Sequence, residues 1–593
     1  MRYSKKIIHL ISRFFFPLRK NIFYIIIFSL FGVFFDIITP LPFKILIDNV
    51  LEKNPLTPHS FEFFLLGDID FLSLGFIVVF LYTASNVLAI LLNYFAQILI
   101  RTVSKDVIIR FSNNTFATIE RMRHAVYRKK DIGDYIYRLS YDVSAISEIF
   151  ESGILPMITN SIFIVITTVI LFLISPSFAL LSFLLVPSMA LLLYVFSKRL
   201  GVAWKKSEYS NSLLFSFIEE ILGQLKNVQA YNLEEHMLTT FQKKETRSLR
   251  YEFNAYSIQF LLNLFIGILI ALGYAGIITY GISLVHAGLV TAGTLVIFLF
   301  YLDNLTNPCI AFMGAYTSMK EHLVKIQRIS ELLEQPVLDE KTTIKDTSHP
   351  LSTSPSIYFK NVSFFGTNDA KILQNATFTI PKEKITVIVG ANGSGKTTII
   401  SLLMGFLSPS RGSILFNNNS ISNFTPEELH SMSAYVPQEI ELFKGTIREN
   451  ILFGDTHASP QAIKKAASMA NASHFIERMP QKYSFQVGER GSKLSGGQRQ
   501  RILIARAFLK SSAKIIIMDE PLSAQDITSH KILIKNIKKF TDKKTVIIVS
   551  NILDIIKIAD HVIIVNKGKI IAQGKNTSIL KQKHLTELLI SLT

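Results

Sequence analysis

Long apolar stretches alternate with charged stretches over the first half of the chain. Those with almost no charge are residues 21–43, 71–100, 152–197 and 253–302. The first contains a single charged residue, Asp36. The last two are too long for one bilayer crossing of about 20 residues, and they divide at residues 175–177 and near residues 281–293. The pattern therefore predicts six transmembrane helices.

The N-terminal residues 1–20 follow a different pattern. They carry no acidic residue and contain the basic residues Arg2, Lys5, Lys6, Arg13, Arg19 and Lys20. Apolar residues fall between these at roughly helical spacing, which is typical of a helix lying on a membrane surface. A cleavable signal peptide fits poorly, because the apolar stretch after Asn21 is too long and lacks a small-residue cleavage site. We predict an interfacial helix at residues 1–20.

In the second half of the chain the apolar runs are short and are bounded by glycine or polar residues. Residues 385–389 and 515–519 are runs of this kind, and they predict buried strands. Residues 320–334 read as a helical extension of the sixth span, and residues 342–355 are rich in Ser, Thr and Pro. The predicted divisions are a transmembrane domain at 21–335, a linker at 336–356 and an α/β domain at 357–593.

Composition and loop charge indicate that the protein is in a membrane and on which side its loops lie. The 593 residues exceed one ordinary domain, and 49% hydrophobic content with 46 Phe indicates a membrane protein. Residues 44–70 are acidic, whereas residues 101–151 and 198–252 are rich in Lys and Arg, so the first loop is expected outside and the other two inside. Both termini and the α/β domain would then be cytoplasmic, at the inner membrane.

The net charge of +18 fits attraction to the anionic cytoplasmic leaflet. Nucleic-acid binding is not expected, because no stripe of base-stacking aromatic residues accompanies the charge. Cys309 is the one cysteine, which excludes an intrachain disulfide, and it falls in an apolar segment as a small packing residue.

A glycine-rich loop follows the first predicted strand of the α/β domain and precedes a helix. Its pattern, G-x-x-x-x-G-K-[ST], lets backbone N–H groups and a helix N-terminus surround the phosphates of a nucleoside triphosphate. Lys396 can reach the β- and γ-phosphates, and the Thr397 hydroxyl suits Mg²⁺. The expected nucleotide contacts are Gly390, Asn392, Gly393, Ser394, Gly395, Lys396, Thr397 and Thr398.

Two adjacent carboxylates end the strand at residues 515–519. Asp519 is placed to hold Mg²⁺, commonly through water, and Glu520 to accept a proton from an attacking water. Between this pair and the phosphate loop lies Leu494-Ser495-Gly496-Gly497-Gln498, followed by a helical run.

With this LSGGQ segment the chain resembles the nucleotide-binding domain of ATP-binding-cassette (ABC) proteins. The resemblance implies that Gln438 is the Q-loop residue that contacts Mg²⁺ and water, and that Asp526 belongs to the D-loop, where Gln525 replaces the usual leucine. It also implies that Ser495, Gly496, Gly497 and Gln498 contact ATP. Phe365 matches the aromatic residue that stacks on adenine, with Phe364 as the alternative and core packing as the competing role for either.

One position departs from the family pattern. After residues 545–550 the family has a histidine that contacts the γ-phosphate, whereas this chain has Asn551. The resemblance therefore implies an ATPase that is slow because the switch histidine is missing. Asn551 joins Glu520 and Gln438 as an expected catalytic residue.

The resemblance extends to an exporter with an all-α membrane domain of six helices followed by the α/β P-loop domain. One copy of each is present, so the working unit is expected to be a dimer, a homodimer rather than a heterodimer, with ATP and Mg²⁺ bound. The implied activity is export or flipping of an amphipathic or lipophilic drug, lipid or peptide. An ATP-gated channel or regulator is the alternative, and only Asn551 favours it. Asp36 and Asp303 are candidates to face the translocation path.

Overall fold

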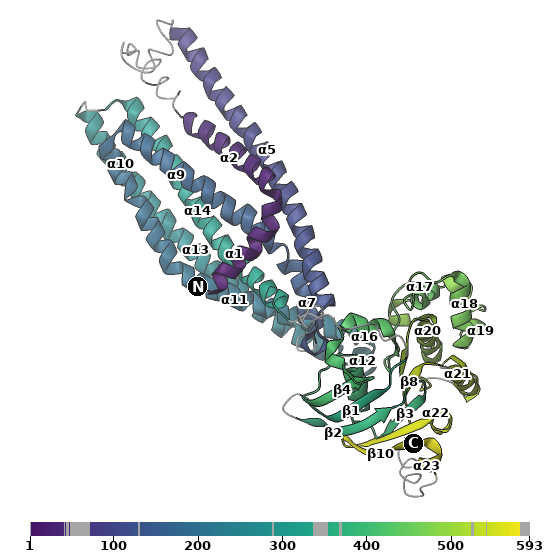
Figure 1. Ribbon diagram of the computed structural model, residues 1–593. Helices are drawn as coiled ribbons and strands as arrows, with labels where there is room; N and C mark the ends of the chain where they lie inside the picture. The colour runs from purple at the N-terminus through teal and green to yellow at the C-terminus, as the bar shows by residue number, and fades with distance from the viewer. Residues whose placement is uncertain are drawn as a thin grey trace. The chain divides into compact units, whose positions relative to one another are not determined.

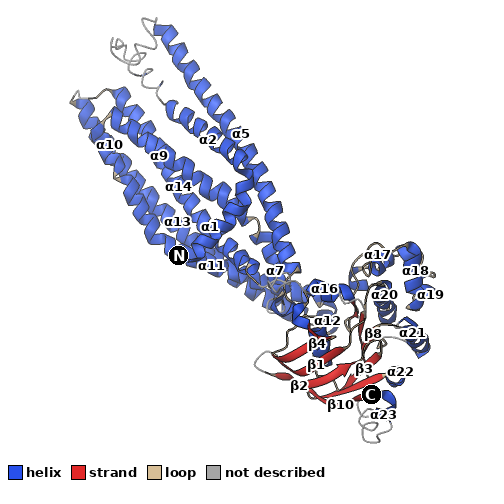
Figure 2. Ribbon diagram, in the orientation of Figure 1, coloured by secondary structure: helices blue, strands red, loops and turns tan. Residues whose placement is uncertain are grey.

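In the computed structural model, the part of the chain that is described comprises residues 2–40, 42, 47, 71–127, 131–287, 290–335, 354–366, 370–523, 527–540 and 543–580. Its contacts separate it into two compact units. Unit 1 comprises Met1–Met122 and Val126–Gln335, and unit 2 comprises Arg123–Ala125 and Pro336–Thr593. The strands all lie in unit 2, whereas unit 1 is helical (Figure 2).

Unit 1 is built of long helices joined by short segments. Its helices are α1 (Arg2–Phe15), α2 (Arg19–Ile38), α5 (Phe71–Glu120), α7 (Ile132–Tyr137), α8 (Ala145–Glu148), α9 (Leu155–Ile174), α10 (Pro176–Phe183), α11 (Leu185–Gly223), α12 (Leu225–Ala230), α13 (Glu234–His286) and α14 (Ala292–Leu333), and the short α6 (His124–Tyr127) is divided between the two units. Helix α2 runs along α5, and α11 runs along α13 (Figure 1).

The six predicted spans are confirmed. Helical stretches long and apolar enough to cross a membrane are His9–Ile38, Gly75–Glu120, Ile132–Ile174, Leu185–Gly223, Glu234–His286 and Gly293–Leu333. The break predicted at residues 175–177 lies at Ser175, whose backbone is extended, and Pro176 begins the next helix. The second break lies between α13 and α14, where the Thr291 hydroxyl caps α14 by accepting a hydrogen bond from the N–H of Thr294 at 3.1 Å.

Helix α1 packs on its own bundle through two aromatic rings. The Phe14 ring meets Phe111 edge-on with centroids 5.0 Å apart, and the Phe15 ring lies 5.0 Å from Phe150. Part of the apolar face predicted to lie on a membrane is therefore covered by protein, and the interfacial placement stays a prediction. The predicted external loop at residues 44–70 and most of the predicted linker lie outside the described residues.

A buried group of charged side chains joins three segments of unit 1 that are distant in sequence. We call it the ion cluster, and it consists of Asp134, Arg138, Asp142, Glu208, Lys325 and Arg328. Arg328 lies 3.0 Å from an Asp134 oxygen, 3.4 Å from Asp142 and 3.7 Å from Glu208, so one guanidinium faces three carboxylates. The Tyr137 hydroxyl donates to Glu208 at 3.0 Å.

Two single π-helical turns, Arg138–Asp142 and Ile149–Ile154, interrupt the helix that leads into the third span. The first of them carries Arg138 and Asp142 of the ion cluster. A π turn contains one more residue than the α-helix would, and such turns are frequent at functional sites.

Unit 2 contains two sheets. The smaller has the order β2-β1-β4-β5, and the larger has the order β10-β9-β3-β8-β7-β6. The strands are β1 (Ile357–Phe365), β2 (Lys371–Ile380), β3 (Ile385–Gly390), β4 (Arg411–Phe416), β5 (Asn419–Ser420), β6 (Ser433–Val436), β7 (Ile515–Asp519), β8 (Thr545–Val549), β9 (His561–Asn566) and β10 (Lys569–Lys575). All neighbours in the larger sheet pair in parallel except β9 and β10.

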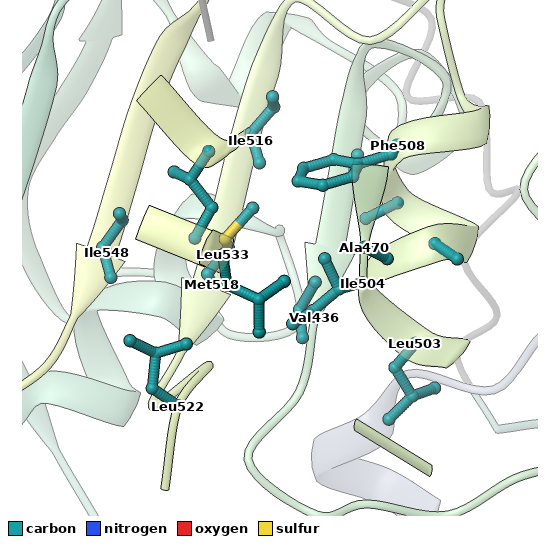
Figure 3. Packing of buried hydrophobic residues seen from close by; sticks show 14 of the residues in the cluster. Val436, Ala470, Leu503, Ile504, Phe508, Ile516, Met518, Leu522, Leu533 and Ile548 are labelled. Carbon is teal, nitrogen blue, oxygen red and sulfur yellow. The ribbon is translucent and has the colours of Figure 1, made fainter. Parts of the chain in front are cut away.

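The helices of unit 2 are α15 (Lys396–Leu403), α16 (Pro426–Met432), α17 (Ile447–Leu452), α18 (Pro460–Met469), α19 (Ser473–Ile476), α20 (Gly496–Leu509), α21 (Ile527–Phe540), α22 (Leu553–Ile558) and α23 (Asn576–Leu580). Helices α17 and α18 pack on α20 rather than on a strand. Ile516 and Met518 of β7 lie on the face that meets Ile504 and Phe508 of α20 (Figure 3). Ile515 and Ile517 alternate to the opposite face and join a second core cluster. Because both faces are buried, the central strands read as continuous apolar runs.

Candidate active site

Four neighbouring parallel strands end at the same edge of the larger sheet. The phosphate loop follows β3, Gln438 follows β6, Asp519 and Glu520 end β7, and Asn551 follows β8. Ligands of open parallel sheets bind outside the carboxyl ends of the strands. The sheet order thus gathers residues that are up to about 160 positions apart in sequence, as the contact between Gly390 and Asn551 shows.

Glycine is required at two kinds of position in the phosphate loop. Gly393 and Gly395 have φ of 75° and 105°, in the left-handed region that other residues rarely adopt. At Gly390 an added Cβ would lie 2.3 Å from the carbonyl oxygen of Val565, which belongs to the backbone of β9. The loop can therefore keep its shape only with these glycines, and Asn392 and Thr397 lie exposed on it, with Thr398 half-buried.

Lys396 is buried and folds back over the loop. Its Nζ donates to the carbonyl oxygens of Gly390 at 2.6 Å and Ala391 at 3.1 Å. Burial lowers the pKa of this ammonium, while the carboxylates of Glu520 and Asp519 act in the opposite direction. Charged phosphate oxygens would be stronger partners than these two neutral carbonyls. The side chain is therefore suited to bind a triphosphate.

Asp519 is buried, and its Oδ2 atom has no hydrogen-bond donor among the described residues. Burial and, to a smaller extent, the Glu520 charge raise the pKa of this carboxyl to about 6, against the opposing effect of the Lys396 charge. A buried carboxylate oxygen with no donor is costly unless a cation completes it. Asp519 therefore fits a Mg²⁺ site, for which the Thr397 hydroxyl and Gln438 are the other predicted ligands. The described residues contain no group of three or more His, Cys, Asp or Glu that could hold a metal by themselves.

Glu520 has a left-handed backbone, with φ of 47°, which is uncommon for a residue other than glycine. Its N–H donates to the carbonyl oxygen of Val549 at 2.9 Å, and its Oε2 accepts from Gln438 Nε2 at 3.3 Å. The carboxylate thus has a hydrogen bond from the predicted Q-loop residue.

Gln500 was missed by sequence reasoning. Its Nε2 donates to the carbonyl oxygen of Glu520 at 3.0 Å and to the Ser523 hydroxyl at 3.4 Å, so it holds the turn that carries Glu520. The available signal was its spacing, because Gln500 follows Gln498 by half a turn on the same helix and would point into the domain. Asp526 lies outside the described residues.

Asn551 contacts the phosphate loop directly. Its Oδ1 accepts a hydrogen bond from the N–H of Gly390 at 3.3 Å. Within the described part of the chain no group accepts a hydrogen bond from its Nδ2, so the two amide donors are available to a ligand. The amide thereby occupies the same edge as Lys396 and Glu520.

Ser495 begins α20 and caps it. Its hydroxyl accepts from the N–H of Gln498 at 3.3 Å, and Gln498 Oε1 accepts from the N–H of Ser495 at 3.0 Å. Ser495 and Gln498 make these bonds with each other rather than with the phosphate loop of the same chain. Gly496 and Gly497, which lack side chains, open the helix and leave its N-terminus accessible to an anion.

The two phenylalanines at the end of β1 have different surroundings. Phe364 packs against the second core cluster, whereas the Phe365 ring lies beneath the Arg411 guanidinium at 5.9 Å. Phe364 therefore has the core role, and Phe365 is the half-buried ring that a base could stack on.

Comparisons with known proteins agree with this geometry. Residues 22–309 match the family described as ABC transporter transmembrane region, and residues 373–523 match the family described as ABC transporter. A candidate export ATP-binding/permease protein of Rickettsia felis is 28% identical over 546 residues, 92% of this chain and 91% of that protein. A candidate multidrug export ATP-binding/permease protein of Staphylococcus aureus is 28% identical over 586 residues, 97% of this chain and 98% of that protein.

A solved structure supports the fold. The structure of a bacterial Atm1-family ABC exporter with ATP bound has a TM-score of 0.88 and 23% sequence identity, and the match covers 97% of this chain and 98% of that one. The two family matches fall in different units, and they follow the chain in the order membrane region, then ATPase. The chain therefore belongs to the ABC transporters, as an exporter half-transporter in which a six-span membrane region is fused to an ABC ATPase domain that binds ATP.

Proposed function

We propose that two copies of this chain export or flip an amphipathic or lipophilic molecule, a drug, lipid or peptide, across the cytoplasmic membrane by alternating access. The observation that carries the proposal is the gathering of Lys396, Asp519, Glu520 and Asn551 at one sheet edge of a chain with six apolar spans. The acidic first loop and the basic segments at 101–151 and 198–252 support a cytoplasmic ATPase domain.

In the proposed reaction, Lys396 and the loop N–H groups hold the β- and γ-phosphates. Glu520 accepts the proton of the attacking water, and Gln438, 3.3 Å from it, orients that water. When bound, Mg²⁺ neutralises charge on the phosphate oxygens, and Asp519 with Thr397 would hold it. The Asn551 amide donates to the γ-phosphate. Phe365 stacks on adenine.

In the proposed dimer, the second copy supplies the other half of each ATP site. Ser495–Gln498 bond to one another and stand at an open helix N-terminus, an arrangement that suits a phosphate brought by another chain. Each ATP would lie between Gly390–Thr397 of one copy and Ser495–Gln498 of the other. A homodimer is favoured, because this chain has its own phosphate loop, signature and Glu520.

The test is substrate-stimulated ATPase activity in liposomes, with transport measured in the same preparation. We expect Lys396→Ala to abolish both while leaving the membrane domain folded, because it removes the charge that binds phosphate. Transport at the parental rate by Lys396→Ala would contradict an ATP-driven exporter.

An ATP-gated channel is the second candidate, and the replacement of the switch histidine by Asn551 is the observation that favours it. In that case ATP binding alone opens a path, and hydrolysis is incidental. Planar-bilayer recording separates the two: ATP-dependent conductance that persists in Glu520→Gln supports the channel, whereas its absence together with stimulated ATPase supports the exporter.

A further inference from the structure

Gln500 lies where the exposed start of α20 meets the buried body of the helix. Ser495 is exposed, whereas Gln500, about 7.5 Å further along the helix, is only 1% exposed. The amide Nε2 of Gln500 donates to the carbonyl oxygen of Glu520 at 3.0 Å and to the Ser523 hydroxyl at 3.4 Å. One buried side chain therefore connects the helix that begins at the signature segment (Ser495–Gln498) to the turn that carries the proposed base.

The turn that carries Glu520 is held in an uncommon conformation by a small set of bonds. A left-handed backbone such as that of Glu520 persists where the surrounding contacts determine it. The Glu520 carbonyl accepts from Gln500, and also from the hydroxyl of Ser523 at 3.1 Å and the N–H of Ser523 at 3.2 Å. Loss of the Gln500 amide would leave this carbonyl two donors, so the turn should still form but would lose this bond to α20.

The start and the body of α20 differ in packing. Ile504 packs with Met518 of β7 in the first core cluster, and within α20 that cluster begins at Ile502 (Figure 3). The first turn opens with Gly496 and Gly497, which have no side chains to add to the core. Closely packed cores resist displacement. A phosphate at the first turn would therefore act on the less tightly packed end of the helix, next to Gln500.

In the proposed dimer, the two ends of this connection serve different ATP molecules. The signature segment of one copy contacts the ATP held by the phosphate loop of the other copy. Glu520 of the first copy acts on the ATP held by its own phosphate loop. Gln500 thus lies on a short route between the two ATP sites, formed by one helix turn and one buried hydrogen bond.

We propose that Gln500 is a positioning residue that couples the two ATP sites of the dimer. When a triphosphate settles the first turn of α20 at one site, the Gln500 amide draws the Glu520 turn of the same chain into its working position at the other site. Each site then hydrolyses ATP fast only when the other site is also filled. This inference rests on the proposed shared sites and adds regulation to them.

The experiment compares two mixed dimers of full-length chains, isolated with two different tags. The first pairs the parental chain with a Glu520→Gln chain, whose own site binds ATP without hydrolysing it. The second pairs the parental chain with a Lys396→Ala chain, whose own site stays empty. The working site has the same residues in both dimers, because its loop and Glu520 come from the parental chain and its signature segment is unchanged.

Single-turnover hydrolysis at saturating ATP is measured by rapid quench, so that product release does not contribute. We expect the first mixed dimer to hydrolyse ATP at least about fivefold faster than the second, the lower end of typical coupling between sites. The ratio of the two rates reports how far the filled second site accelerates the working one.

Gln500→Met, which keeps the side-chain length and removes the donor, is then placed in one chain at a time. In the chain that supplies the working Glu520, it should lower the faster rate to the slower one, so the ratio falls to about one. In the other chain it should leave the ratio within about twofold of its starting value. Gln500→Ala should give the same pattern.

The matched control is Asn576→Leu, which removes a buried amide of α23 that donates to the carbonyl oxygen of Ile556 at 2.9 Å. This substitution should leave both rates and their ratio unchanged.

A ratio that stays constant while both rates fall would show that Gln500 only positions Glu520, and would overturn the coupling. An equal effect of Gln500→Met in either chain would also overturn it, as would equal rates of the two mixed dimers before Gln500 is changed. Absence of hydrolysis in both mixed dimers would contradict the shared sites themselves, and this inference with them.

Discussion

Asn551 is the residue at which the sequence predicts a departure from the family pattern. Its Oδ1 is engaged by the Gly390 N–H, so ATP would meet only the neutral amide donors. The γ-phosphate is charged, so the amide bond to it contributes about 1.5–3 kcal/mol, but the amide adds neither the positive charge nor the shared proton of an imidazole. A loss of about 1–2 kcal/mol in the transition state corresponds to a hydrolysis step roughly five- to thirtyfold slower than with histidine.

Asn551→His should therefore raise kcat by that factor and change KM for ATP little. Steady-state ATPase kinetics of the reconstituted protein test this, with His530→Asn as a control that removes an imidazole elsewhere in the domain. An unchanged or lower kcat would show that the neighbours of Asn551 already compensate, and the idea of a slow ATPase should be dropped.

Glu520→Gln should bind ATP but hydrolyse it at least about a hundredfold more slowly, because the base is lost and the phosphate cradle is not. The variant should accumulate as an ATP-bound dimer. Size-exclusion chromatography with bound-nucleotide analysis checks this. Parental turnover in the variant would show that another group is the base.

At the scale of elements, the ion cluster connects α7 and its π turn to α11 and α14. Asp142 is fully buried, and its ion pairs are with Arg328. Removal of one partner from a buried pair costs about 3–5 kcal/mol, because the remaining charge stays buried without compensation. The cluster therefore holds the three helices in one arrangement.

We expect Arg328→Ala to lower the free energy of unfolding by about 3–5 kcal/mol. The matched control is Arg101→Ala. Arg101 forms an ion pair with Glu151, but the arginine side chain is 75% exposed, so this pair should contribute less than about 1 kcal/mol. Thermal unfolding of both variants in the same detergent measures the difference. Equal shifts in Tm would contradict a special role for the cluster.

Comparison of the elements shows which parts a sequence can reveal. The six spans and the break at Ser175 could be predicted because length, hydropathy and a proline are local signals. The loop glycines and the strand ends could be predicted because motif spacing encodes their turn geometry. The ion cluster could not, because Arg328 meets Asp134 across 194 positions and nothing local marks the pair. Gln500 was missed for a similar reason: its partner is a backbone carbonyl, which every residue has.

At the scale of the whole molecule, one chain carries one phosphate loop and one signature segment, and the proposed sites are shared between copies. Co-expression of two inactive variants tests this arrangement. Lys396→Ala destroys the phosphate loop, and Gly496→Asp places a carboxylate where the triphosphate of the partner would lie, at a helix start that tolerates an acid.

A mixed dimer of these variants contains one site with both defects and one intact site. We expect purified mixed dimers, isolated with two different tags, to recover a substantial part of the parental ATPase, while each variant alone is inactive. No recovery in the mixed dimer would contradict sites shared between two copies.

The ion cluster also has a consequence for folding during synthesis, because its residues leave the ribosome at different times. Asp134, Asp142 and Glu208 leave the ribosome long before Arg328, which follows Asp134 by 194 positions. At about 5–20 residues per second this interval lasts about 10–40 s. Until then Asp142 lacks its ion-pair partner Arg328, and Glu208 lacks both Lys325 and Arg328. Asp134 has only Arg138. The charged ends of the earlier helices should therefore stay hydrated and open. A chain that stops before Lys320 should therefore be cleaved within residues 131–144 by limited proteolysis, whereas the full chain is protected there, and the membrane region closes only when its last helix is complete.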